Sequence, residues 1–196
     1  MRMVPLALTA AVALSACSQE AQQPEPDMVT FNDVMLKQID EPADALWDVA
    51  NAAIGDEGGI DPARMDDAKW DRLAMLAGRV KAGADAIAAM EPVKVARDGV
   101  KIGDEDIEGG HTAAQVQAAI DRDPALLREL ANSLGGHMTE LEAAAKAHDA
   151  ARAGPLVDQL DGVCESCHLR FWYPEQREMV ERYQREGVIV DEGDPQ

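Results

Sequence analysis

The chain has 196 residues, of which 37 are acidic and 18 are basic, so its formal net charge is −19 at pH 7. This excess argues against nucleic acid and anionic lipid surfaces as partners. It leaves open a basic protein partner or a merely solvated acidic surface, and the length suffices for one domain with a hydrophobic core.

The N-terminal segment has the composition of an export signal. Arg2 precedes an apolar stretch too short to span a bilayer and then small residues, which predicts a signal peptide over residues 1 to 16. The sequence LSAC, which ends at Cys17, resembles a bacterial lipobox and predicts Cys17 as the lipidated first residue of the mature chain; the alternative is an ordinary secretory signal. Polar, proline-containing residues up to 27 complete a flexible tether over residues 17 to 27.

From residue 28 to residue 196 the sequence predicts a single all-α domain, because Ala, Leu, Met and charged residues dominate and no strand pattern is evident. A first helix is predicted over residues 28 to 53. Its apolar face recurs at spacings of three and four residues, at Met28, Phe31, Met35 and Ile39. Pro42 predicts a kink or short break in this helix.

Asp-Pro pairs predict the starts of two further helices. Asp61-Pro62 begins the second, over residues 62 to 90, and Asp123-Pro124 begins the third, over residues 124 to 148. The pair Gly135-Gly136 in the third helix indicates either a close approach to a cofactor or neighbouring helix, or a local bend.

The remaining segments are shorter or less regular. Residues 92 to 111 are rich in Gly and acidic residues and predict a loop across one end of the domain, followed by a short helix over residues 112 to 120. A fourth long helix is predicted to start near Pro155 and to end at Tyr173-Pro174. A last helical piece is predicted over residues 175 to 184.

The fourth helix carries the motif C-x-x-C-H at Cys164, Cys167 and His168. On a helix these positions share one face, so two thiols can add to the two vinyl groups of one porphyrin edge while the imidazole turns toward the iron. The motif therefore predicts one covalently attached haem c per chain. The alternatives are a C-x-x-C redox pair, which is expected near a βαβ pattern, and half of a zinc site, which needs a second ligand cluster.

Four long helices joined by connections of varied length predict an antiparallel up-and-down four-helix bundle with haem c bound on the last helix. Aromatic residues are few, with three Trp, two Tyr and two Phe. A core of Ala, Leu and Met therefore leaves room for a large apolar plate, and the haem would supply much of the core volume.

On these residues the chain resembles the class II c-type cytochromes, the cytochrome c′ group, over about residues 28 to 173. Members of this group are four-helix bundles with C-x-x-C-H on the last helix and an axial-side residue on the first. The resemblance implies that Cys164 and Cys167 form the thioethers and that His168 is the fifth iron ligand. The group usually has a basic residue four places after the His, where this chain has Trp172; Arg170 is only two places on.

The sixth iron position decides between two kinds of haem protein. By the resemblance, Met35 lies where low-spin relatives have a Met ligand, and His/Met ligation favours electron transfer. Alternatively Met35 is an apolar core residue that covers a five-coordinate, gas-binding iron. Met28, one heptad earlier on the same face, is a second candidate ligand.

We therefore expect a non-enzymatic periplasmic electron-transfer protein that cycles between Fe(II) and Fe(III) with a redox partner protein. A five-coordinate protein that binds or protects against NO or CO, and an accessory lipoprotein with structural haem, are the alternatives. The lipid on Cys17 would anchor the chain to a membrane, and Ser18, rather than Asp, favours the outer membrane. The resemblance also implies a homodimer. Surface or capping roles are expected for His111, His137 and His148.

Overall fold

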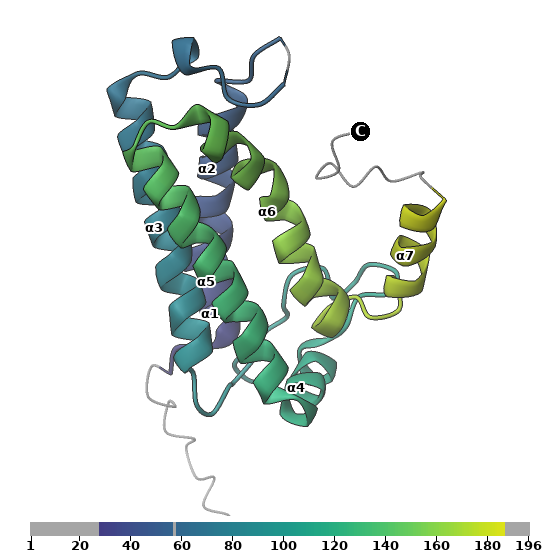
Figure 1. Cartoon of the computed structure of the whole chain (residues 1–196). Helices are drawn as coiled ribbons and strands as arrows, with labels where there is room; N and C mark the ends of the chain where they lie inside the picture. The colour runs from purple at the N-terminus through teal and green to yellow at the C-terminus, as the bar shows by residue number, and fades with distance from the viewer. Residues whose placement is uncertain (1–27, 57, 187–196) are drawn as a thin grey trace, which may run out of the picture.

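The computed structural model describes residues 28 to 56 and 58 to 186, and these residues are mostly helical with no strand among them (Figure 1). The all-α class predicted from the sequence is therefore confirmed for this part of the chain. The predicted signal peptide, the lipidation of Cys17 and the tether lie outside the described residues. Within the described ranges, no helix combines the length and apolar character needed to cross a membrane.

The first helix consists of three consecutive segments, α1 (Phe31–Val34), η1 (Met35–Asp40) and α2 (Glu41–Asn51), with η1 in π-helical geometry. Of the kink or short break predicted at Pro42, the break does not occur, because the helix continues across this residue. The Glu41 N–H instead bonds to the Leu36 carbonyl, five residues back. A π turn before a proline widens the helix where the ring would otherwise crowd the preceding turn, so the irregularity precedes Pro42 rather than following it.

Two predicted helix starts need correction. The Asp61 carboxylate caps only the short 3-10 segment η2 (Pro62–Arg64), and the second long helix, α3 (Asp67–Ala89), starts after its own cap at Asp66. The last long helix, α6 (Ala150–Phe171), starts before Pro155, because Asp149 accepts a hydrogen bond from the Arg152 N–H at 3.1 Å and fixes the first turn there. Because of the Asp149 cap, the helix starts about one turn before the predicted start and Pro155 lies inside it.

The other predicted helices are confirmed. A reciprocal Thr112–Gln115 capping box starts α4 (Ala113–Arg122), and the Asp123 side chain caps α5 (Pro124–Lys146). The final helical piece is α7 (Arg177–Arg185). The loop predicted over residues 92 to 111 contains no helix.

Helix α3 packs against α5 and against the first helix, and α5 packs against α6. The core consists mainly of Ala, Leu, Ile and Val side chains, with few aromatic rings. Figure 1 shows the long helices running along a common direction, with α6 diverging from α5 toward its C-terminal end and α4 crossing that end of the molecule. This divergence separates the C-terminal half of α6 from the other long helices.

Gly83 is the residue that lets α3 approach the first helix. A Cβ atom at this position would lie 2.8 Å from Cγ1 of Ile39 and 2.9 Å from the carbonyl oxygen of Gln38, so only glycine fits. Gly135 on α5 is also close to α3, where a Cβ would lie 3.3 Å from an Asp85 carboxylate oxygen, whereas a Cβ at Gly136 would meet nothing within 4 Å. The close approach considered for the glycine pair therefore applies to Gly135 alone.

We expect Gly83→Ala to lower the free energy of unfolding by about 1 to 2 kcal/mol, because overpacking against η1 outweighs the gain in helix propensity. The matched variant Gly136→Ala, in an exposed helical position, should raise it by roughly 0.5 to 1 kcal/mol. Urea unfolding followed by circular dichroism measures both values. Equal stability of the two variants would contradict the close contact at Gly83.

Candidate functional site

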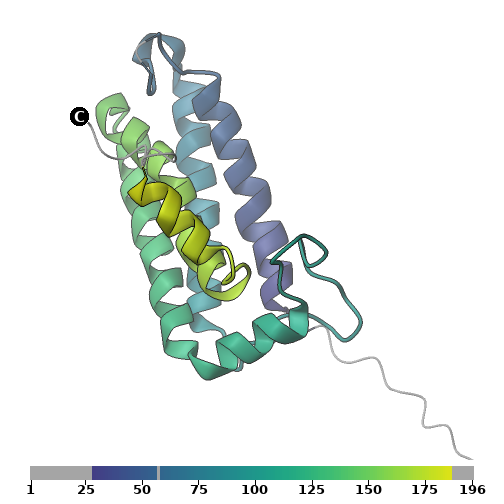
Figure 2. The ribbon, with the colours of Figure 1, turned by 90° about the vertical axis from the view of Figure 1, so that its right-hand side faces the viewer.

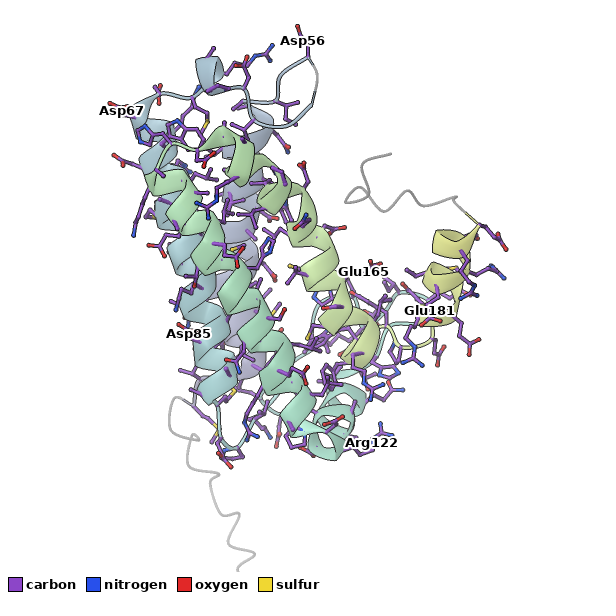
Figure 3. The ribbon with its side chains drawn as sticks, in the orientation of Figure 1. Asp56, Asp67, Asp85, Arg122, Glu165 and Glu181 are labelled. Carbon is purple, nitrogen blue, oxygen red and sulfur yellow. The ribbon has the colours of Figure 1, made fainter. Side chains whose placement is uncertain are left out.

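The C-x-x-C-H motif lies in the C-terminal half of α6, where this helix diverges from α5. Cys164, Cys167 and His168 all line one cavity of about 620 Å³. Glu165, labelled in Figure 3, belongs to the same stretch of α6 and also lines it. A cavity of this volume is in the range that holds small organic cofactors.

The cavity walls are largely apolar and come from several elements. The first helix contributes one wall and α5 another, with the side chains of Phe31, Met35, Leu36, Ile39, Leu127, Leu130 and Leu134. Leu36 is 47% exposed, and Leu130 and Leu134 are half-buried, because the walls do not pack against each other. A flat apolar group between these walls would remove this surface from water, which is energetically favourable.

Of the two candidate methionine ligands, Met35 lines the cavity with His168, and Met28 is not among its lining residues. Met35 is half-buried, whereas Met28 is 47% exposed. The structure thus brings together four of the residues singled out from the sequence, namely Cys164, Cys167, His168 and Met35.

Both thiols of the motif are free, and burial strongly disfavours their ionised form. Burial, with a smaller contribution from Asp161 and Asp40, raises the pKa of Cys164 to about 12. Burial and the neighbouring Cys164 raise the pKa of Cys167 to about 12. Redox-active C-x-x-C pairs depend on a lowered thiol pKa, so this environment does not favour that interpretation of the motif.

The His168 imidazole is held among aromatic rings. Its centroid lies 6.3 Å from the Trp172 ring and 6.0 Å from the Tyr173 ring, which meets it edge-on. Burial lowers the pKa of His168, although the Asp104 and Asp161 carboxylates act in the opposite direction. Burial thus favours the neutral imidazole, which is the form that binds a metal. Within residues 28–56 and 58–186, no side chain or backbone group forms a hydrogen bond with this ring.

The charged part of the cavity lining is mostly acidic. The polar lining includes the carboxylates of Asp40, Asp44, Asp104, Asp161 and Glu165, and no Lys or Arg occurs among the described lining residues. Burial, followed by repulsion from Asp44 and Asp104, raises the pKa of Asp40. Asp40, Asp44, Asp104 and Asp161 are exposed, so these carboxylates give the cavity a negative field that water partly screens.

Trp172, which stands where the resemblance would expect a basic residue, and the nearby Arg170 both have structural roles. Trp172 is buried and stacks on Phe31 with ring centroids 5.3 Å apart. Arg170 is absent from the cavity lining, and its guanidinium lies 3.8 Å from the Asp123 carboxylate. Neither residue contributes a cation to the cavity.

The other three described histidines lie outside the cavity lining. The His137 Nε2 is 2.7 Å from the Leu156 carbonyl oxygen and ties α5 to α6. His148 has a left-handed backbone conformation just after α5, and its ring stacks on Trp70. The His111 N–H donates to the Trp172 carbonyl at 2.9 Å, while its Nδ1 is buried without a partner among the described residues.

Besides the acidic residues of the first helix and α6, two joined residues of the site were not singled out from the sequence. Asp104 comes from the loop between α3 and α4, and Tyr173 follows α6; both line the cavity, and the Tyr173 hydroxyl donates a hydrogen bond to Asp104 at 2.6 Å. The nearness of Tyr173 to the motif could have marked it as a candidate. No local pattern distinguishes Asp104 from the other acidic residues of its loop.

The start of the first helix is fixed by a charged cluster next to the cavity. Thr30 and Asp33 form a capping box, and Arg97 lies 2.8 Å from the Asp33 carboxylate. The N–H groups of Phe31 and Asn32 donate to carbonyls of the loop at residues 94 and 95. These bonds satisfy donors that a helix start leaves free and hold Phe31 in the cavity wall.

No group of three or more His, Cys, Asp or Glu among the described residues is arranged to hold a metal ion. A haem iron does not need such a group, because the porphyrin supplies four nitrogen ligands. Comparison of the chain with protein-family models, curated protein sequences and solved structures found no match. A functional assignment therefore depends on the geometry and chemistry of the cavity.

We expect Asp33→Asn to lower the free energy of unfolding at pH 7 by about 1 kcal/mol, allowing for solvent screening. Hydrogen bonds from Thr30 and the charge of Arg97 lower the pKa of Asp33 from 3.8 to about 2. The contribution of this carboxylate is therefore complete above about pH 4 and is lost as the pH falls toward about 2.

Chemical denaturation between pH 2 and pH 7 measures the difference between the parent and the variant. Asp98→Asn, at a carboxylate that is 92% exposed, is the control and should change stability little at any pH. A constant effect of Asp33→Asn over the whole range would contradict the capping role.

Proposed function

We propose that this protein is a haem c-binding electron-transfer protein. The observation that carries the proposal is that Cys164, Cys167 and His168 line one apolar cavity together with Met35 from another helix. The residues fit the group: two neutral thiols at helical spacing for attachment, a neutral imidazole without a hydrogen-bond partner among the described residues, and apolar walls for the macrocycle.

Attachment would use the two thiols of the motif. Each thiol would add across one vinyl group, so that a carbon–sulfur bond would form, the vinyl π bond would be lost and the thiol hydrogen would go to the other vinyl carbon. The step involves no net oxidation or reduction. The i, i+3 spacing of Cys164 and Cys167 on α6 matches the two vinyl groups on one edge of the ring, and His168 on the same face would hold the iron.

The arrangement of the long helices supports the wider family proposal. The first helix, α3, α5 and α6 would constitute an antiparallel up-and-down four-helix bundle of the cytochrome c′ group, with the motif on its last helix. The three-residue connection between α5 and α6 is typical of antiparallel neighbours in such bundles. The loop before α4 and α4 itself would form the long connection across one end.

Bound haem iron supplies one-electron chemistry, since Fe(II) gives one electron to an oxidised partner and Fe(III) takes one from a reduced partner. The thioether of Met35 would be the second protein ligand that holds the iron, beside His168, and the apolar side chains around it would exclude water. A basic redox protein is the expected partner, because the chain carries a net charge of −19 at pH 7. We further propose a periplasmic location with a lipid anchor at Cys17, on the evidence of the N-terminal sequence.

A second candidate function is the binding of small gases at a five-coordinate iron. Leu36 and Ile39 line the cavity next to Met35, and such side chains could cover the iron without ligating it. The two functions differ in whether the Met35 sulfur occupies the sixth position.

The spectrum of the reduced protein distinguishes these functions. With Met35 as ligand, the parent should be low-spin and should not react with carbon monoxide, and Met35→Leu, which keeps the side-chain volume, should become high-spin and bind carbon monoxide. Met28→Leu is the matched control and should leave the spectrum unchanged, because Met28 is not among the cavity-lining residues.

Rapid carbon monoxide binding by the parent would reject the electron-transfer proposal in favour of the gas-binding one. A protein purified from a host with haem-attachment machinery that carries no covalent haem would reject both.

A further inference from the structure

The loop between α3 and α4 is fastened to the residues that directly follow the motif. The Tyr173 hydroxyl donates to the Asp104 carboxylate at 2.6 Å, the His111 N–H donates to the Trp172 carbonyl at 2.9 Å, and the Gln176 side chain donates to the Glu108 carbonyl at 3.1 Å. Figure 2 shows this loop running past the start of the first helix. The loop therefore closes part of the cavity wall, to which it contributes Gly103 and Asp104.

The backbone of the loop is shaped to present Asp104. This residue has a φ of 60°, which is unusual for a residue with a side chain. A Cβ at Gly110 would lie 2.2 Å from the Asp104 carbonyl oxygen, so only glycine allows the loop to fold back this closely. The Tyr173 hydroxyl then fixes the direction of the Asp104 carboxylate.

Tyr173 connects this carboxylate to the histidine of the motif. Its ring meets the His168 ring edge-on with centroids 6.0 Å apart, and all three side chains line the same cavity. No described Lys or Arg in the lining offsets the negative charge of Asp104 there. Asp40, Asp44, Asp161 and Glu165 add to the negative field, but no hydrogen bond to a described residue fixes the direction of their carboxylates.

We propose that Asp104, held by Tyr173, is a positioning residue that lowers the reduction potential of an iron bound at His168. This inference rests on the haem-binding function proposed above. A fixed negative charge near the iron stabilises Fe(III), which carries one more positive charge than Fe(II). Asp104 is an exposed residue, so water screens part of this effect and the fixed direction of its carboxylate matters more than burial. The carboxylate would act through its electrostatic field, with its direction set by the Tyr173 hydroxyl.

The test is a redox titration of the full-length holoprotein and its variants. Asp104→Asn removes the charge but keeps an oxygen that accepts the Tyr173 hydrogen bond, so its potential should be more positive than that of the parent. Asp106→Asn is the matched control, because Asp106 is in the same loop and is exposed like Asp104, but pairs with Lys101 at 2.8 Å and is not among the cavity-lining residues. Its potential should stay close to that of the parent.

A second variant, Tyr173→Phe, tests the positioning role and covers the case in which Asp104→Asn fails to fold. It keeps the charge but releases the carboxylate, so the potential should shift in the same direction by a smaller amount. Hydrogen exchange of the loop amides at residues 103 to 111 should become faster in this variant and remain near the parent rate in Asp104→Asn. Adding Asp104→Asn to Tyr173→Phe should then change the potential less than it does in the parent.

Equal shifts in Asp104→Asn and Asp106→Asn would reduce the effect to net charge and overturn the proposal, as would an unchanged potential in both Asp104→Asn and Tyr173→Phe. These results leave the haem-binding function intact, because covalent haem and its spectrum are measured on the same samples. Absence of covalent haem from the parent would overturn both proposals.

Discussion

The cavity depends on the contact between Phe31 at the start of the first helix and Trp172 at the end of α6. Their rings stack with centroids 5.3 Å apart, and both are buried. Such aromatic pairs contribute about 0.5 to 1.5 kcal/mol beyond the burial of their area. The stack joins two helices near the motif and thereby sets the space between them, which the first helix and α5 line with apolar side chains.

Hydrogen bonds around this stack help to keep the first helix and the end of α6 at this distance. The Phe31 N–H is bonded to the Lys94 carbonyl, and the Trp172 carbonyl accepts the His111 N–H, so one loop is tied to both partners of the stack. The rest of the core consists mostly of aliphatic side chains and alanines. Gly83 lets α3 approach the first helix closely. Tight packing of the first helix against α3 at Gly83 thus contrasts with the open, largely apolar cavity that the first helix also lines.

Much of the fold could be predicted from local signals. Thr112 and Asp123 mark helix starts because their side chains cap the backbone directly, and the motif at Cys164 could be recognised because its spacing follows from helical geometry. The errors at Pro62 and Pro155 share one cause: a proline favours an early helical position, but a nearby Asp decides where the cap forms. The π-helical turn before Pro42 was missed because its apolar spacing is compatible with an α-helix.

The site itself could be predicted only in part. Met35 and His168 were singled out from the sequence and both line the cavity, but the acidic lining residues and the loop contacts were missed. The bond between Tyr173 and Asp104 joins residues 69 positions apart, and nothing in the local sequence of either residue indicates the other. Long-range contacts of this kind arise from the packing of whole elements and leave no periodic pattern.

The central claim is that Cys164 and Cys167 hold one haem covalently. The direct test is mass spectrometry of the intact protein, produced from the full-length sequence in a bacterium that attaches haem c. We expect the mass of one haem added to the chain and located on the peptide that contains both cysteines. A peptide with free thiols, or with a disulfide between Cys164 and Cys167, would contradict it.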